Sequence, residues 1–126
     1  MKIEHVAIWV KDLEVMRQFY EQYFEATSSE KYVNETKGFA SYFLTMASDC
    51  RIELMTRRDI VSEKEGEQFG YAHLAISLGS KEKVDQFTEI FQNDGFKIAG
   101  LARTTGDGYY ESVILDPEGN TIELTI

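Results

Sequence analysis

Apolar and polar positions alternate from residue 3 to residue 10, the pattern of a strand with one buried face. One face carries Val6, Ile8 and Val10, and the opposite face carries His5, Ala7 and Trp9. A helical period follows from Asp12 to Glu25, and Asp12 suits the N-cap position. The apolar stripe of this helix is Leu13, Met16, Tyr20 and Tyr23, with Phe19 and Phe24 beside it. The chain therefore begins with a strand and an amphipathic helix.

Three further strands are predicted in the first half of the chain, over residues 26–33, 39–46 and 50–56. These segments are rich in aromatic and β-branched residues, and Lys37-Gly38 and Ser48-Asp49 separate them as turns. The order of elements is a strand, a helix and three strands.

The second half of the chain repeats the first. Residues 71–76 resemble residues 3–8, and His73 lies 68 positions after His5. Residues 121–125 resemble residues 51–55, and Glu123 lies 70 positions after Glu53. Two pairs of similar segments with nearly equal separations indicate a duplicated unit. We expect one domain of two modules, 1–57 and 71–126, joined by a charged linker at 58–70.

The second module should contain the same elements as the first. Ser80 can cap a helix that ends at Asn93-Asp94-Gly95, and its expected stripe is Val84, Phe87, Ile90 and Phe91. Strands are expected at 97–104, 109–115 and 120–126. Asp116-Pro117-Glu118-Gly119 suits a type I turn before the last strand. The predicted fold class is α+β, with two βαβββ modules.

Composition narrows the function classes. The chain of 126 residues is 43% hydrophobic, and its formal charge of −9 disfavours binding to nucleic acid or anionic membranes. No long apolar stretch appears, so we expect a soluble, cytoplasmic protein. Cys50 is the single cysteine, which excludes an intramolecular disulfide and a thiolate-rich zinc site. Any metal must therefore have nitrogen and oxygen ligands.

Two histidines and two glutamates lie at matching positions of the two modules, on strand faces opposite the helices. Any one of them alone is ordinary on an open strand face. Packing of the modules about a pseudo-two-fold axis could bring all four together, and this set suits zinc, nickel, cobalt, manganese or ferrous iron. The charge of a divalent ion would also balance the two carboxylates. The four residues are His5, Glu53, His73 and Glu123.

These residues and two longer motifs resemble the vicinal-oxygen-chelate superfamily, which includes glyoxalase I, bleomycin resistance proteins and extradiol dioxygenases. Residues 70–76 resemble the glyoxalase I motif around its second histidine, and residues 116–124 resemble the closing motif of the family. The resemblance implies paired βαβββ modules whose mixed sheets curl around a central cavity. It also implies a homodimer, with one metal ion per site.

The resemblance to glyoxalase I implies that the metal holds two neighbouring oxygens of a small substrate while a proton moves between adjacent carbons. Glu123 would be the catalytic base, Glu53 would serve the opposite face, and both histidines would remain ligands. The sequence departs from glutathione-using members at Trp9 and Arg57, where an arginine and an asparagine are usual. Trp9 is interpreted either as an apolar or stacking wall beside the metal or as a residue of dimer or core packing, and Arg57 or Arg103 as a partner for an anionic group.

Three functions remain open on these grounds. The first is a metal-dependent glyoxalase-like lyase or isomerase, a class that includes lactoylglutathione lyase. The second is a metal-free small-molecule binder of the drug-resistance type, which needs no ligand set. The third is an extradiol-type dioxygenase, a group that commonly uses two histidines and one glutamate.

Overall fold

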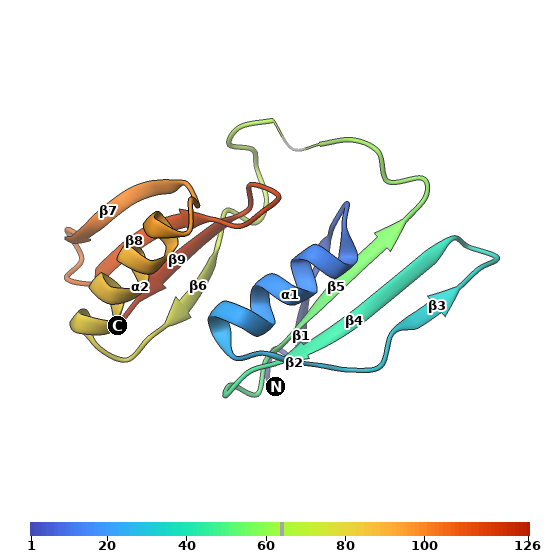
Figure 1. The fold of residues 1–126 in the computed structure, drawn as a ribbon, viewed down its shortest axis with the longest axis horizontal. Coiled ribbons are helices and arrows are strands. Elements are labelled where there is room, and N and C mark those ends of the chain that lie inside the picture. Colours follow the sequence, from blue (N-terminus) through green and yellow to red (C-terminus); the bar gives the residue numbers. More distant parts are fainter. Residues whose placement is uncertain (64) are drawn as a thin grey trace. The chain divides into compact units, whose positions relative to one another are not determined.

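The computed structural model describes residues 1–63 and 65–126, and position 64, in the expected linker, lies outside the described residues. Met1–Glu63 forms one compact unit, and the described residues after it form a second. Figure 1 shows a helix and a sheet in each. The first unit contains β1 (His5–Trp9), α1 (Leu13–Phe24), β2 (Thr27–Ser28), β3 (Tyr32–Asn34), β4 (Phe39–Thr45) and β5 (Arg51–Arg57). The second contains β6 (Leu74–Ser77), α2 (Lys81–Asn93), β7 (Ile98–Thr104), β8 (Tyr110–Leu115) and β9 (Thr121–Thr125).

Both sheets have the same topology. The strand order is β1-β5-β4-β2 in the first unit, with β3 also paired to β4, and β6-β9-β8-β7 in the second. In each sheet the first and last strands of the unit are parallel neighbours, and the remaining pairs are antiparallel. The predicted α+β class and the βαβββ order are confirmed.

The predicted alternation of strand faces is confirmed by burial. Ile52, Leu54, Ile122 and Leu124 are buried against the helices, and Glu53 and Glu123 between them are partly exposed. The α1 stripe is also buried as predicted at Leu13, Met16 and Tyr20. Each sheet therefore packs one face on its helix and turns its polar residues to the other face. No helix in the described part of the chain is long and apolar enough to cross a membrane.

Two predictions about elements were wrong in detail. Residues 26–33 do not form one strand, because the register of β3 on β4 differs by one residue from that of β2, which is the offset of a β-bulge. Ile90 is exposed, and Thr88 is buried in its place. At 100° per residue Ile90 lies about 120° from Val84, whereas Thr88 lies about 40° from it.

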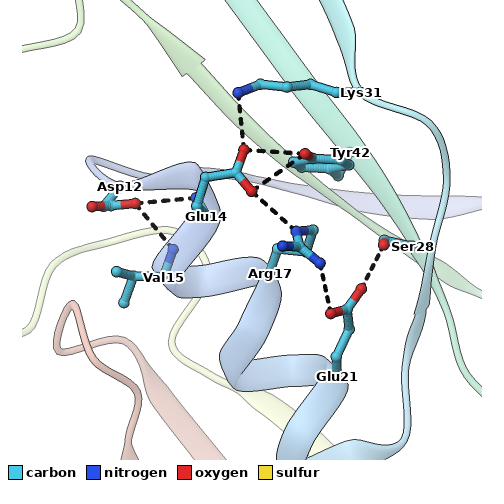
Figure 2. A network of polar contacts seen from close by, with 8 residues as sticks. All are labelled: Asp12, Glu14, Val15, Arg17, Glu21, Ser28, Lys31 and Tyr42. Atoms are coloured by element: carbon cyan, nitrogen blue, oxygen red, sulfur yellow. Dashed lines mark hydrogen bonds and ion pairs between the residues drawn. The ribbon is translucent and has the colours of Figure 1, made fainter.

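A hydrogen-bonded network connects α1 to the face of the sheet that packs against this helix (Figure 2). Glu14 accepts hydrogen bonds from Lys31 at 2.9 Å and from the hydroxyl of Tyr42 at 3.1 Å. The bond from Lys31 is the main cause that lowers the pKa of the Glu14 carboxyl. The network continues from Arg17 to Glu21 and from Ser28 to Glu21. It joins the helix to β4 and to the bulged segment, and so supports the sheet that carries Glu53.

The two helices end differently. In α2 the N–H of Phe96 donates to the carbonyl of Phe91 and the N–H of Gly95 to that of Gln92, which is a Schellman motif with glycine in the left-handed conformation. In α1 the corresponding left-handed position is occupied by Glu25, with a φ of 53°. A side chain with a Cβ is strained there.

We predict that Glu25→Gly stabilises the protein by about 0.5–1 kcal/mol, because glycine adopts positive φ without the steric cost of a Cβ. Urea unfolding should show a higher midpoint with an unchanged slope. Glu25→Ala is the matched control, since it removes the same charge and keeps a Cβ. Equal stabilisation by both variants would show that removal of the negative charge at the helix end, and not relief of backbone strain, causes the effect.

The predicted turn before the last strand is present, and it is organised by Asp116, whose side chain is 4% exposed. The N–H of Gly119 donates to the carbonyl of Asp116 at 3.0 Å, as a β-turn requires. The Asp116 carboxylate accepts from the backbone N–H groups of Glu118 and Asn120 and from the side chain of Asn120. Burial raises the pKa of Asp116, and these hydrogen bonds act in the opposite direction. The turn sets the start of β9, and hence the position of Glu123.

We predict that Asp116→Ala destabilises the fold by about 2–3 kcal/mol, because two backbone donors lose their acceptor inside a turn. Asp116→Asn keeps one acceptor oxygen and should cost less. Thermal or urea unfolding of the two variants measures the difference. A loss of less than about 0.5 kcal/mol in the alanine variant would contradict the role given to the carboxylate.

Candidate metal-binding residues

The first unit brings together His5 and Glu53. In the parallel pair of β1 and β5, Ala7 is the ladder partner of Glu53, and His5 lies two residues before Ala7 on the same face. Nε2 of His5 lies 3.8 Å from Oε2 of Glu53. The Glu53 side chain is 15% exposed and the imidazole 38%, so the carboxylate is largely covered while the ring remains accessible.

The second unit brings together His73 and Glu123 in the same way. Ala75 is the ladder partner of Glu123, and His73 again lies two residues before that alanine. Nε2 of His73 lies 3.2 Å from Oε2 of Glu123, and the glutamate side chain is 21% exposed. Each unit therefore contributes one imidazole nitrogen that faces one carboxylate oxygen.

The separations fit two ligands of one metal ion. Nitrogen and oxygen atoms that each lie about 2.1 Å from a zinc-sized ion, in tetrahedral or octahedral geometry, are about 3.0–3.4 Å apart. The pair in the second unit is within this range, and the pair in the first exceeds it by a few tenths of an ångström. No group of three or more His, Cys, Asp or Glu side chains suited to a metal is found among the described residues.

His5 has further partners in its own unit. Nδ1 of the ring is hydrogen-bonded to Oε2 of Glu4, and the guanidinium of Arg51 also donates to Glu4. These two hydrogen bonds lower the pKa of the Glu4 carboxyl. The ring of Phe43 meets the imidazole edge-on at 5.3 Å between centroids, and Arg51 lies over the same phenyl ring at 4.1 Å.

Trp9 and Arg57 also lie together, beside the pair in the first unit. The Cζ atom of Arg57 is 5.0 Å from the centroid of the Trp9 ring, and Phe39 meets Trp9 edge-on at 6.3 Å. Asp59 accepts two hydrogen bonds from Arg57, at 2.5 and 3.1 Å. Trp9 is 40% exposed.

Arg103 belongs to the second unit, in β7. It is exposed and is the ladder partner of Glu111 in β8, which in turn pairs with Thr125 in β9. Because ladder partners share a face, Arg103 lies on the same sheet face as Glu123.

Glu4, Phe43 and Arg51 are neighbours of His5 that were not predicted from the sequence. Arg51 has the same parity as Glu53 in β5, so alternation alone would have placed it on the polar face. Phe43 could not be found in this way, because its position opposite Glu53 depends on the register between β4 and β5. The side chain of Glu4 reaches His5 around the start of β1, where alternation no longer applies.

Comparison with known proteins shows the family. The model for the Glyoxalase/Bleomycin resistance protein/Dioxygenase superfamily matches residues 2–124. The uncharacterized protein YqjT of Bacillus subtilis (strain 168) is 27% identical over 131 residues, covering 97% of this chain and 96% of that protein.

Solved structures show the same fold. The glyoxalase family protein from Enterococcus faecalis superposes with a TM-score of 0.80 at 20% identity, covering 99% of this chain and 97% of that one. Glyoxalase I from Zea mays has a TM-score of 0.80 at 22% identity over 98% of this chain, which spans 44% of the length of the maize chain. The family match over nearly all of the sequence and the shared arrangement of paired βαβββ units agree: this chain belongs to the Glyoxalase/Bleomycin resistance protein/Dioxygenase superfamily.

Proposed function

We propose that this protein is a divalent-metal-dependent lyase or isomerase of the glyoxalase type, acting on a small molecule with two vicinal oxygens. The observation that carries the proposal is the pair of equivalent His–Glu arrangements, His5 with Glu53 and His73 with Glu123, each with Nε2 facing a carboxylate oxygen. Two imidazoles and two carboxylates form a neutral site with one zinc, nickel, cobalt, manganese or ferrous ion. The two modules that complete a site belong to one chain or to two chains of a homodimer.

The chemistry divides between the bound ion and the side chains. A bound divalent ion would supply positive charge that stabilises negative charge on the two substrate oxygens. Glu123 would take a proton from one carbon and return it to the neighbouring one, as its position in the closing motif implies by resemblance. Glu53 would serve the opposite face of the substrate. His5 and His73 would hold the ion as ligands.

The aromatic and cationic residues near Glu53 are proposed to bind the part of the substrate that does not react. Trp9 and Phe39 offer an apolar surface, and Arg57 lies over the indole ring with its charge partly balanced by Asp59. A planar or apolar substrate group with a carboxylate at its far end fits this chemistry. Arg103 is the corresponding anion partner in the second module. Trp9 and Arg57 stand where glutathione-using members usually carry an arginine and an asparagine, so lactoylglutathione is only one candidate substrate within the class.

We predict that purified protein binds one equivalent of zinc or nickel per site, and that His5→Ala weakens this binding by more than about 100-fold, since loss of a mere outer partner already costs roughly 10–100-fold. Glu123→Gln should lower kcat for the methylglyoxal adduct of glutathione by about 10²–10⁴-fold, the usual contribution of a general base. Isothermal calorimetry and a steady-state assay measure the two effects. Glu89→Gln, at an exposed position of α2, is the matched control for loss of a carboxylate.

The outcomes separate the candidate functions. Absence of metal binding, with small-molecule affinity unchanged in both variants, would refute the metalloenzyme and leave a metal-free binder. Metal binding without turnover of the glutathione adduct would keep the enzyme class and exclude that substrate. Oxygen consumption with a catechol and ferrous iron would instead assign an extradiol-type dioxygenase.

We predict that the metal-loaded protein binds 4-carboxybenzohydroxamate more tightly than benzohydroxamate, because both offer vicinal oxygens and only the first offers a distant carboxylate. Arg57→Gln should weaken binding of the carboxylated ligand by about 10- to 150-fold, the effect of a single charge-assisted hydrogen bond, and leave the affinity for the other ligand unchanged. Trp9 is the single tryptophan of the chain, so its fluorescence reports binding directly. Equal weakening for both ligands would show that Arg57 acts only through the packing of Trp9.

A further inference from the structure

The two His–Glu pairs have equivalent backbones and different surroundings. Ala72, Val113 and Thr121 occupy in the second module the positions of Glu4, Phe43 and Arg51 in the first. His5 therefore lies among an acid, an aromatic ring and a guanidinium, whereas the residues at the same positions near His73 are small or aliphatic. The two modules thus have equivalent histidines but different side chains around them.

The contacts of His5 define the direction of its ring. The Glu4 carboxylate accepts a hydrogen bond from Nδ1 of His5, while Nε2 on the opposite side of the ring faces Glu53. Arg51 donates to the same Glu4 carboxylate from Nε and Nη2, which orients that carboxylate. Phe43 packs edge-on against the imidazole and is covered by Arg51 on its own face. The ring is thus held by one hydrogen bond and one aromatic contact.

A hydrogen bond at Nδ1 decides which nitrogen of a neutral histidine can bind a metal. When Nδ1 carries the proton and donates it to a carboxylate, Nε2 keeps its lone pair. Such carboxylate–histidine pairs orient the ligand and increase its basicity in metal sites. The arrangement of Glu4 and His5 matches this requirement on geometry alone.

We propose that Glu4 is a positioning residue, which Arg51 holds in place and which keeps His5 in the tautomer whose Nε2 lone pair faces Glu53. The part of this inference that concerns metal affinity rests on the proposed function, and the part that concerns the tautomer does not. His73 has no carboxylate at the equivalent position of residue 72, so its tautomer does not depend on such a partner. The first module therefore has a carboxylate partner for its histidine that the second module lacks at the equivalent position.

The test uses metal-free protein labelled with ¹⁵N at histidine, in long-range ¹H–¹⁵N correlation spectra at pH 8.5. The chain contains two histidines, and a His73→Gln variant assigns both signals. In the unsubstituted protein His5 should be mainly the Nδ1–H tautomer. Glu4→Ala should shift it toward the Nε2–H form, and Glu4→Gln should lie between, because the amide oxygen still accepts a hydrogen bond. The His73 signals should not change.

Zinc affinity is the second readout, measured by competition with a chelator. Glu4→Ala should weaken binding by about 10- to 100-fold, the usual effect of losing a carboxylate partner, and Glu4→Gln by less. Glu35→Ala removes an exposed carboxylate of the same module and controls for the change in net charge. Circular dichroism of each variant verifies folding.

The results distinguish this inference from the function on which it partly rests. An unchanged His5 tautomer in Glu4→Ala overturns the positioning role, as does a loss of zinc affinity no larger than that of Glu35→Ala. A shifted tautomer in a protein that binds no zinc in any form supports the positioning of His5 and refutes the proposed metalloenzyme instead.

Discussion

The parallel pairing of the first and last strands in each module is the constraint on which the candidate site depends. Residues far apart in sequence become ladder neighbours through this pairing, with Ala7 beside Glu53 and Ala75 beside Glu123. Parallel strands need a long connection, and here the helix and the two intervening strands provide it. The small alanine side chain leaves space on the polar face, and a histidine two residues earlier on the same face then approaches the glutamate.

The helices make this pairing stable. Leu54 and Leu124, next to the glutamates in sequence, are completely buried against α1 and α2. A one-residue slip of β5 or β9 would bury a glutamate and expose these leucines, so the register is strongly specified. The network around Glu14 and the turn at Asp116 add polar restraints at the helix and at the start of β9. The packing of each sheet on its helix thus both stabilises the fold and fixes the positions of the two carboxylates.

The duplicated modules share a backbone plan and differ in their side chains. The first has Glu4, Phe43 and Arg51 around its histidine, and the cluster of Trp9 and Arg57 farther along the same face. The second has a shorter parallel strand and an exposed arginine at position 103. The two His–Glu pairs therefore share a backbone arrangement and differ in the side chains around them.

Part of the fold could be predicted from local patterns in the sequence. Alternation identified which residues of β5 and β9 face the helices, and the caps at Asp12 and Ser80 gave the helix starts. The boundary that failed depends on pairing with a distant strand, because the bulge between β2 and β3 exists only in relation to β4.

The same division holds for the candidate site. The sequence by itself determined the four repeated residues and the face on which each lies, because strand parity and internal repetition are local properties of the chain. Only the tertiary structure decided that each histidine meets the glutamate of its own module. It also decided that Glu4 binds His5 and that Arg57 covers Trp9, since strand register and side-chain direction depend on elements that are remote in sequence.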